Sequence, residues 1–188
     1  SLQLLNRATI GGNIVNAAPC ADSMPPLIIY EAEVELRSAR GTRRMPVSEF
    51  VIGGYRTLLE PDELVIRFIL PAPTQQPLIN RYLQLGRRNA LNITRQSLTG
   101  QFMVDKGVVR LCRLVDGALL AKPQRLLEVE QALIGRTLDA ATIDYAAGVL
   151  HARVEKAIGG RWSAPYKVPV FIDMFRQMLQ EVMTEQKK

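Results

Sequence analysis

The residues best suited to hold a polar ligand lie near the start of the chain. Thr9-Ile10-Gly11-Gly12-Asn13 places two adjacent glycines between a hydroxyl and an amide side chain, and Asp22 follows after a run of small residues. Glycine has no Cβ, so this stretch can turn sharply and approach a ligand closely. Thr9 can cap the turn and leave backbone N–H groups free to face an anion. The pattern indicates a binding loop, although an ordinary Gly-Gly turn is its commoner origin.

No other residues form a catalytic or metal-binding set. His151 is the single histidine and has no Ser, Cys or Asp motif beside it, so we expect a structural role. Cys20 and Cys112 are far apart and lack metal-ligand spacing, which favours small buried thiols in a reducing compartment, the cytoplasm. There is no P-loop and no GxGxxG motif. We therefore expect no catalytic and no metal-ligating residue, and any chemistry would come from a bound cofactor.

The composition is that of an ordinary globular protein. The 188 residues are 47% hydrophobic and 22% charged, which suits one large domain or two small ones. The net charge of +6 permits nucleic-acid binding, but the basic residues are scattered and no binding motif accompanies them. No apolar run approaches the ~20 residues of a membrane span. We expect neither nucleic acid nor a membrane as a partner. One basic cluster flanks the Gly41-Thr42 turn, where we expect a solvated hairpin tip: Arg37, Arg40, Arg43 and Arg44.

Hydrophobic periodicity predicts strands first and helices last. A helical turn is expected over 10–15, and apolar and charged residues then alternate as a hairpin over 32–47, with Glu33 and Glu35 on its solvent face. The Asp62/Glu63 pair is expected in a solvated turn before a strand over 64–70, and the Pro-rich stretch 71–77 is a candidate linker. Further strands are expected over 78–86, 95–104, 108–115 and 119–123. Helices with apolar stripes follow, starting near Leu126, Asp139 and Ser163. This order indicates an α+β fold.

Seven segments, in order, resemble the FAD-binding medium subunit of the molybdenum hydroxylases. That family includes xanthine dehydrogenase, aldehyde oxidoreductase and aerobic carbon monoxide dehydrogenase. The glycine motif with Asp22 carries the resemblance first, and Gly54-Tyr55-Arg56-Thr57 and Gly160-Arg161-Trp162-Ser163-Ala164-Pro165-Tyr166-Lys167 extend it toward the end of the chain. The remaining segments are Ala32–Leu36, Arg40–Arg43, Pro61–Val65 and Arg87–Ile93.

The resemblance implies two domains. Residues 1–72 would be the second FAD-binding subdomain, the C-terminal part of a PCMH-type FAD-binding domain. Residues 78–185 would be a small sheet-plus-three-helix domain similar to the C-terminal domain of the CO dehydrogenase flavoprotein. Relatives carry an additional N-terminal subdomain of roughly a hundred residues, the size of a small domain. We therefore expect this chain to be a fragment with an incomplete FAD site that is inactive alone.

The resemblance also implies site residues. Thr9, Ile10, Gly11, Gly12 and Asn13 would wrap the FAD near its phosphates or ribityl chain. Asp22 would accept a hydrogen bond from a ribityl or ring-edge atom, and Val65 would pack near the isoalloxazine. Gln84 stands where many relatives carry a lysine, and Asn92 stands where they usually carry an aspartate. A neutral amide at 84 would stabilise an anionic reduced flavin less than a lysine does.

The implied function is electron transfer in a hetero-oligomer. Electrons would leave a molybdopterin-binding large subunit, pass through a [2Fe-2S] small subunit, and reach NAD or another acceptor through FAD held here. The alternative is a flavin-free structural or assembly subunit of the same kind of complex, which the Gln84 and Asn92 departures favour.

Overall fold

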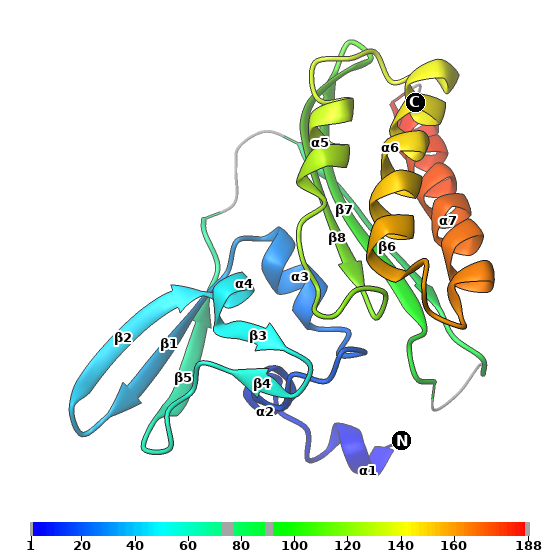
Figure 1. The fold of residues 1–188 in the computed structure, drawn as a ribbon. Helices are drawn as coiled ribbons and strands as arrows, with labels where there is room; N and C mark the ends of the chain where they lie inside the picture. The colour runs from blue at the N-terminus through cyan, green and yellow to red at the C-terminus, as the bar shows by residue number, and fades with distance from the viewer. Residues whose placement is uncertain (1, 73–76, 89–91, 187–188) are drawn as a thin grey trace.

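The computed structural model describes residues 2–72, 77–88 and 92–186. Parts of the predicted linker over 71–77 and of the segment over 87–93 lie outside the described residues. Figure 1 shows a three-stranded sheet that projects from the body of the molecule, and a second sheet covered by helices. This mixture of small sheets and helices confirms the predicted α+β class.

The first part of the chain builds the projecting sheet and the short helices at its base. Thr9 begins α2 as predicted, and the hairpin β1–β2 and the strand β5 form where the alternation of apolar and charged residues predicts them. The strand order is β2-β1-β5, with antiparallel neighbours. The elements are α1 (Leu2–Leu5), α2 (Ile10–Asn16), α3 (Met24–Ile29), β1 (Glu33–Ser38), β2 (Gly41–Pro46), α4 (Val47–Phe50), β3 (Val51–Gly53), β4 (Arg56–Thr57) and β5 (Leu64–Ile69).

Two carboxylates expected in solvent are buried instead. Glu35 is only 2% exposed, because Arg44 and Arg67 from the neighbouring strands cover it at 2.7 and 3.0 Å. Glu63 is also buried and accepts two hydrogen bonds, 2.6 and 2.7 Å, from Arg43. These arginines lower the pKa of both carboxyls, that of Glu63 to about 2. The prediction that these two carboxylates are solvated is wrong, because strand pairing places arginines against them. Glu33 and Asp62 are exposed as expected.

The second part of the chain forms the sheet β6-β7-β8 and the long helices. Its strands are antiparallel neighbours in sequence order, and Lys106 and Gly107 turn the β7–β8 hairpin with φ of 51° and 80°. Asp139 caps α6 as predicted, accepting the Thr142 N–H at 2.8 Å. The elements are β6 (Ile79–Leu85), β7 (Gln96–Asp105), β8 (Val108–Gly117), α5 (Leu127–Leu133), α6 (Ala140–Ile158) and α7 (Ala164–Glu185).

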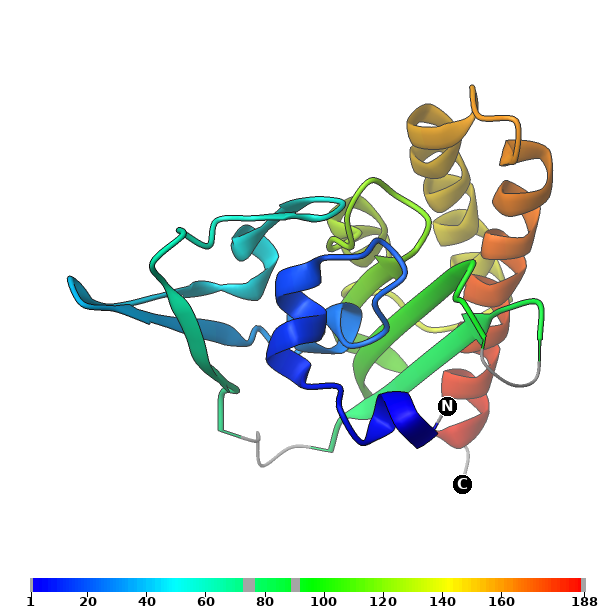
Figure 2. The ribbon, with the colours of Figure 1, turned by 90° about the horizontal axis from the view of Figure 1, so that it is seen from below.

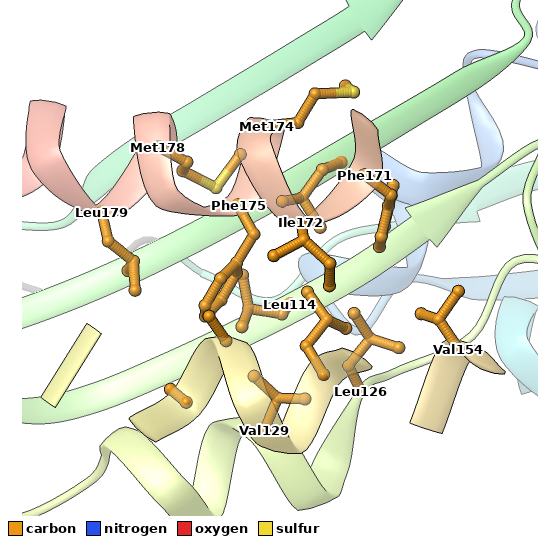
Figure 3. Close-up of a cluster of buried hydrophobic side chains, with 14 of the residues drawn as sticks. Leu114, Leu126, Val129, Val154, Phe171, Ile172, Met174, Phe175, Met178 and Leu179 are labelled. Carbon is orange, nitrogen blue, oxygen red and sulfur yellow. The ribbon is translucent and has the colours of Figure 1, made fainter. Parts of the chain in front are cut away.

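One face of this sheet packs against α5 and α7, and α6 packs against both of these helices. Figure 3 shows Phe171, Ile172 and Phe175 of α7 directed toward Leu114 of β8 and toward the helix α5. All four side chains are buried, and burying a side chain of this size contributes about 1.5–3 kcal/mol to folding. The apolar stripes read from the sequence are therefore the faces that form this core.

The predicted strand over 119–123 is wrong. The chain leaves β8 at Gly117 and folds back on the buried Asp116. The Asp116 carboxylate accepts the backbone N–H groups of Leu120 at 3.0 Å and Gln124 at 3.2 Å. A carboxyl group that accepts backbone N–H groups competes with strand pairing for these donors, so this segment forms a loop.

The other face of the β6-β7-β8 sheet receives the first part of the chain. Figure 2 shows α2 and α3 on the side of this sheet away from α6 and α7. Val115 of β8 is buried in the cluster formed by residues of α2, α3, β1 and α4. Lys122 also donates to the carbonyls of Ser48 at 3.1 Å and Val51 at 2.9 Å. Residues before and after the linker therefore share one interface, which positions the candidate site.

Candidate functional site

The glycine motif forms the first turn of α2. Thr9 is its N-cap, with φ of −120°, and its hydroxyl accepts the Gly12 N–H at 3.0 Å. Neither glycine has a positive φ, and both lie in the helical turn that the sequence predicts over 10–15. A Cβ on Gly12 would lie 3.1 Å from the Thr9 hydroxyl, and one on Gly11 would lie 3.9 Å from Val65 Cγ1. The motif is therefore compact, and β5 brings Val65 beside it.

Asn13 links this turn to the segment that carries Asp22. Its side-chain oxygen accepts a hydrogen bond from the Ser23 hydroxyl at 2.5 Å. The Asn13 amide nitrogen, a potential donor of two hydrogen bonds, has no partner among the described residues. Asn13 is exposed, so this donor is available to a ligand.

Asp22 is the centre of a polar network that the sequence did not reveal. One carboxylate oxygen accepts from Tyr82 at 2.8 Å and from Thr94 at 2.6 Å, and the other accepts from the Gln84 amide at 3.0 Å. The Gln84 amide also donates to the Thr94 hydroxyl. Strand register explains why these side chains meet. Tyr82 and Gln84 are two residues apart on β6 and so lie on the same face, and Thr94 lies just before β7, the strand that pairs with β6.

The Asp22 network is partly shielded from water. Burial raises the pKa of the Tyr82 phenol well above its ordinary value, and the neighbouring Asp22 carboxylate raises it further. Tyr82 therefore keeps its proton and acts as a hydrogen-bond donor to Asp22 throughout the physiological pH range. A carboxylate can accept about four hydrogen bonds, and Asp22 accepts three, so it retains one acceptor position.

The predicted site residues thus lie along one strip. It runs from Val65 past Gly11, Gly12 and Thr9 to Asn13, and from Asn13 through Ser23 to Asp22 and Gln84. Ile10 belongs to the same turn, with its side chain 53% exposed. Tyr82 and Thr94 were missed, because no sequence pattern shows which side chains will meet across a strand pair.

A second feature adjoins this strip at Thr94. A pocket of about 790 Å³ opens between the two parts of the chain, and it has a marked aromatic rim. Trp162 is 92% exposed, Tyr55 is 69% exposed and Tyr166 is 50% exposed. Tyr55 also has a φ of 59°, an unusual backbone conformation for a bulky residue. The other lining residues are Pro19, Cys20, Arg87, Thr94, Arg95, Ala118, Ser163, Pro165 and Lys167.

The pocket is positively charged. Arg87, Arg95 and Lys167 line it, and none of the three forms an ion pair with a carboxylate among the described residues. Lys167 donates to the carbonyls of Arg95 at 3.1 Å and Ala118 at 3.0 Å. Burial lowers the pKa of Lys167, and the nearby charges of Arg161 and Arg95 lower it further. Such crowding of like charges favours an anionic ligand.

Of the remaining chemical groups, His151 and Cys112 lie away from both features, whereas Cys20 lines the pocket. His151 is exposed on α6. Cys112 is fully buried, and burial raises the pKa of its thiol. Cys20 is half-buried at the pocket, rather than fully buried as expected. The described residues contain no cluster of three or more His, Cys, Asp or Glu side chains able to hold a metal ion. None of the helices in the described ranges is long and apolar enough to span a membrane.

Comparison with known proteins assigns the family. Residues 1–73 match the FAD binding domain in molybdopterin dehydrogenase, and residues 82–182 match the CO dehydrogenase flavoprotein C-terminal domain. The chain belongs to the FAD-binding subunit family of the molybdenum hydroxylases. The resemblance inferred from the sequence is thereby confirmed.

Relatives in this flavoprotein family cover most of the chain. The xanthine dehydrogenase FAD-binding subunit of Escherichia coli O157:H7 is 28% identical over 181 residues, 96% of this chain and 62% of that protein. The nicotinate dehydrogenase FAD-subunit of Eubacterium barkeri is 28% identical over 98% of this chain and 64% of its own length. A carbon monoxide dehydrogenase structure from Hydrogenophaga pseudoflava, which lacks the Mo-pyranopterin moiety of its cofactor, superposes with a TM-score of 0.83 at 27% identity. That match covers 94% of this chain and 61% of the other, so the chain spans about three fifths of the length of these relatives.

The strip fits the FAD of this flavoprotein family in its chemistry. The exposed Asn13 amide can donate to a phosphate or hydroxyl oxygen, and the remaining acceptor position of Asp22 can receive a hydroxyl or ring N–H. The half-buried Val65 offers an apolar surface beside Gly11, where a side chain larger than hydrogen would narrow the approach. A donor, an acceptor and an apolar surface of the kinds that contact a flavin nucleotide are thus present on one strip.

Proposed function

We propose that this chain is part of a flavoprotein subunit of a hetero-oligomeric molybdenum hydroxylase. In this proposal electrons come from a molybdopterin-binding subunit and a [2Fe-2S] subunit, and leave to NAD or another acceptor. When bound, FAD supplies the redox chemistry, because the two cysteines of the chain are free thiols and do not form a redox-active disulfide. The free thiols of Cys20 and Cys112 suit a cytoplasmic enzyme.

The observation that carries the proposal is the continuity of the strip from Val65 to Gln84. Residues from α2, β5, β6 and the segment before α3 meet there, although they are scattered through the sequence. Thr9 to Asn13 would hold the FAD near its phosphates or ribityl chain, and Asp22 would accept a hydrogen bond from it. Val65 would contact the isoalloxazine. The domain division at 72 and 78 and these residue roles remain predictions.

The aromatic pocket supports a nucleotide as the electron acceptor. Planar rings stack well on exposed aromatic side chains, and phosphates bind well to arginine and lysine. The pocket adjoins the Asp22 network through Thr94, so a nucleotide held there would lie near the proposed flavin. This combination favours a nicotinamide dinucleotide of the NAD type, with or without a 2′-phosphate, over dioxygen, a small acceptor that needs neither feature.

One observation favours a flavin-free structural subunit instead. Asp22 already accepts hydrogen bonds from Tyr82, Gln84 and Thr94, so its charge is compensated without any ligand. In that case the network serves only to hold the two parts of the chain together. Flavin binding distinguishes the two proposals.

The test is flavin content of the complete natural polypeptide that contains these residues. We expect bound FAD, and a loss of affinity of about tenfold or more in Asp22→Ala, because a hydrogen bond to a charged group is worth about 1.5–3 kcal/mol. Asp62→Ala is the matched control, since Asp62 is an exposed carboxylate paired with Arg40. A colourless polypeptide that gains no flavin absorbance on incubation with FAD would support the structural alternative.

A further inference from the structure

The positive charge of the aromatic pocket exceeds what the pyrophosphate of a dinucleotide without a 2′-phosphate requires. Arg87, Arg95 and Lys167 line it, and Arg161 is close enough to lower the pKa of Lys167. No aspartate or glutamate is among the lining residues that the structure describes. The nearest acidic group of the candidate site, Asp22, is occupied by three hydrogen-bond donors.

The absence of a carboxylate from this lining matters for nucleotide choice. Sites that select NAD commonly place an Asp or Glu on the ribose 2′-hydroxyl, whereas sites that select the 2′-phosphorylated form use an arginine there. A 2′-phosphate adds about −2 charge at neutral pH, and three uncompensated cations would attract it strongly. A dinucleotide without a 2′-phosphate offers only its pyrophosphate to the same cations.

We propose that the pocket binds an adenine nucleotide carrying a 2′-phosphate in preference to one without it. This inference rests on the proposed function, because it makes the acceptor an NADP-type rather than an NAD-type dinucleotide. Trp162, Tyr55 and Tyr166 provide the faces for its planar rings. Arg87 and Arg95 are the candidate partners of the 2′-phosphate, since the Lys167 ammonium already donates to two carbonyls.

The experiment uses the single tryptophan as a reporter. Trp162 is the only tryptophan in the sequence and is 92% exposed at the pocket rim, so stacking of an adenine ring should quench its fluorescence. The probes are 2′,5′-ADP and 5′-AMP, which differ by the 2′-phosphate alone. We expect 2′,5′-ADP to bind at least about tenfold more tightly at low salt, as a charge-assisted phosphate contact should provide.

Variants assign the preference to the pocket. Arg87→Gln and Arg95→Gln should each reduce the ratio of the two affinities severalfold and leave the binding of 5′-AMP nearly unchanged. Arg110→Gln is the control, because Arg110 lies at the hairpin end of β8 beside Asp105, away from the pocket. Both pocket arginines are at least partly exposed, so these variants should fold.

Equal affinities for the two probes, or no binding of either, would overturn the inference. A preference for 2′,5′-ADP that persists in both arginine variants would also overturn it, since the phosphate would then bind elsewhere. Neither probe requires flavin. A polypeptide that binds 2′,5′-ADP but never FAD would therefore contradict the proposed flavoprotein function while supporting the pocket.

Discussion

Asp116 provides a prediction whose size can be worked out from the structure. Its side chain is fully buried, and burial raises its pKa from an ordinary value of 3.8 to about 7, although the backbone N–H groups of Leu120 and Gln124 and the charge of Arg153 oppose the shift. The folded protein therefore keeps this proton at pH values where the unfolded chain has lost it. Since the unfolded state binds fewer protons, stability falls as the pH rises from about 4 to about 7.

The linkage relation gives the magnitude. With pKa values of 3.8 unfolded and about 7 folded, Asp116 alone should lower the free energy of unfolding by about 2.5 kcal/mol between pH 5 and pH 8. Asp116→Asn removes the titrating group but keeps the shape of the side chain and one side-chain oxygen that can accept a backbone N–H. We expect the stability difference between the two pH values to be about 2.5 kcal/mol smaller in this variant.

The assay is urea unfolding of both proteins at pH 5 and pH 8. Other titrating groups contribute equally to both proteins, so only the difference between their pH dependences is interpreted. Asp105→Asn serves as a control for the loss of a carboxylate at the protein surface, because the Asp105 side chain is exposed. Parallel pH profiles for the wild type and Asp116→Asn would refute the reasoning and imply that the carboxylate is ionised in the folded protein.

Three further predictions concern stability. Gly100→Ala should lower the free energy of unfolding by about 1–3 kcal/mol, because the added Cβ would lie 2.5 Å from Phe102 and 2.6 Å from Met178. Gly148→Ala has open space in α6 and should raise the free energy of unfolding by about 0.5–1 kcal/mol. Urea melts with the opposite signs would contradict this. Thr9→Ala should cost about 1 kcal/mol by removing the cap of α2, and Thr9→Ser should restore most of it in the same assay; equal losses in both would show that the cap is not responsible. Because paired arginines lower the pKa values of Glu35 and Glu63, both carboxylates stabilise the fold above their ordinary pKa of 4.5, and this contribution should be lost as the pH falls toward about 2; an acid melt of Glu63→Gln as steep as that of the wild type would contradict it.

Helix caps and turns were predictable from the sequence, because each depends on a residue that contacts its own segment of the chain. Thr9 and Asp139 cap the helices that follow them, and Lys106-Gly107 turns the hairpin between β7 and β8. Each of these depends on contacts within four residues, which spacing alone reveals.

Contacts between distant segments were not predictable. Glu35 was placed in solvent because its strand alternates regularly, but Arg67 reaches it from β5, a strand far along the chain. The segment after Asp116 was predicted to be a strand, but it forms a loop because the buried Asp116 side chain accepts its backbone N–H groups. Asp22 was singled out as the carboxylate that follows the glycine motif, and its role came from the resemblance to a family. Its partners Tyr82 and Thr94 could not be found from the sequence, because they meet it through strand register.

The central claim is that the strip from Val65 to Gln84 holds a flavin, and flavin stoichiometry tests it most directly. The complete natural polypeptide should be purified, and FAD released from it should be quantified beside the same measurement on Asp22→Ala and on the control Asp62→Ala. We predict close to one FAD per polypeptide in the wild type and the control, and a marked loss in Asp22→Ala. Full FAD occupancy in Asp22→Ala, or no FAD in the wild type even after incubation with the cofactor, would contradict the account.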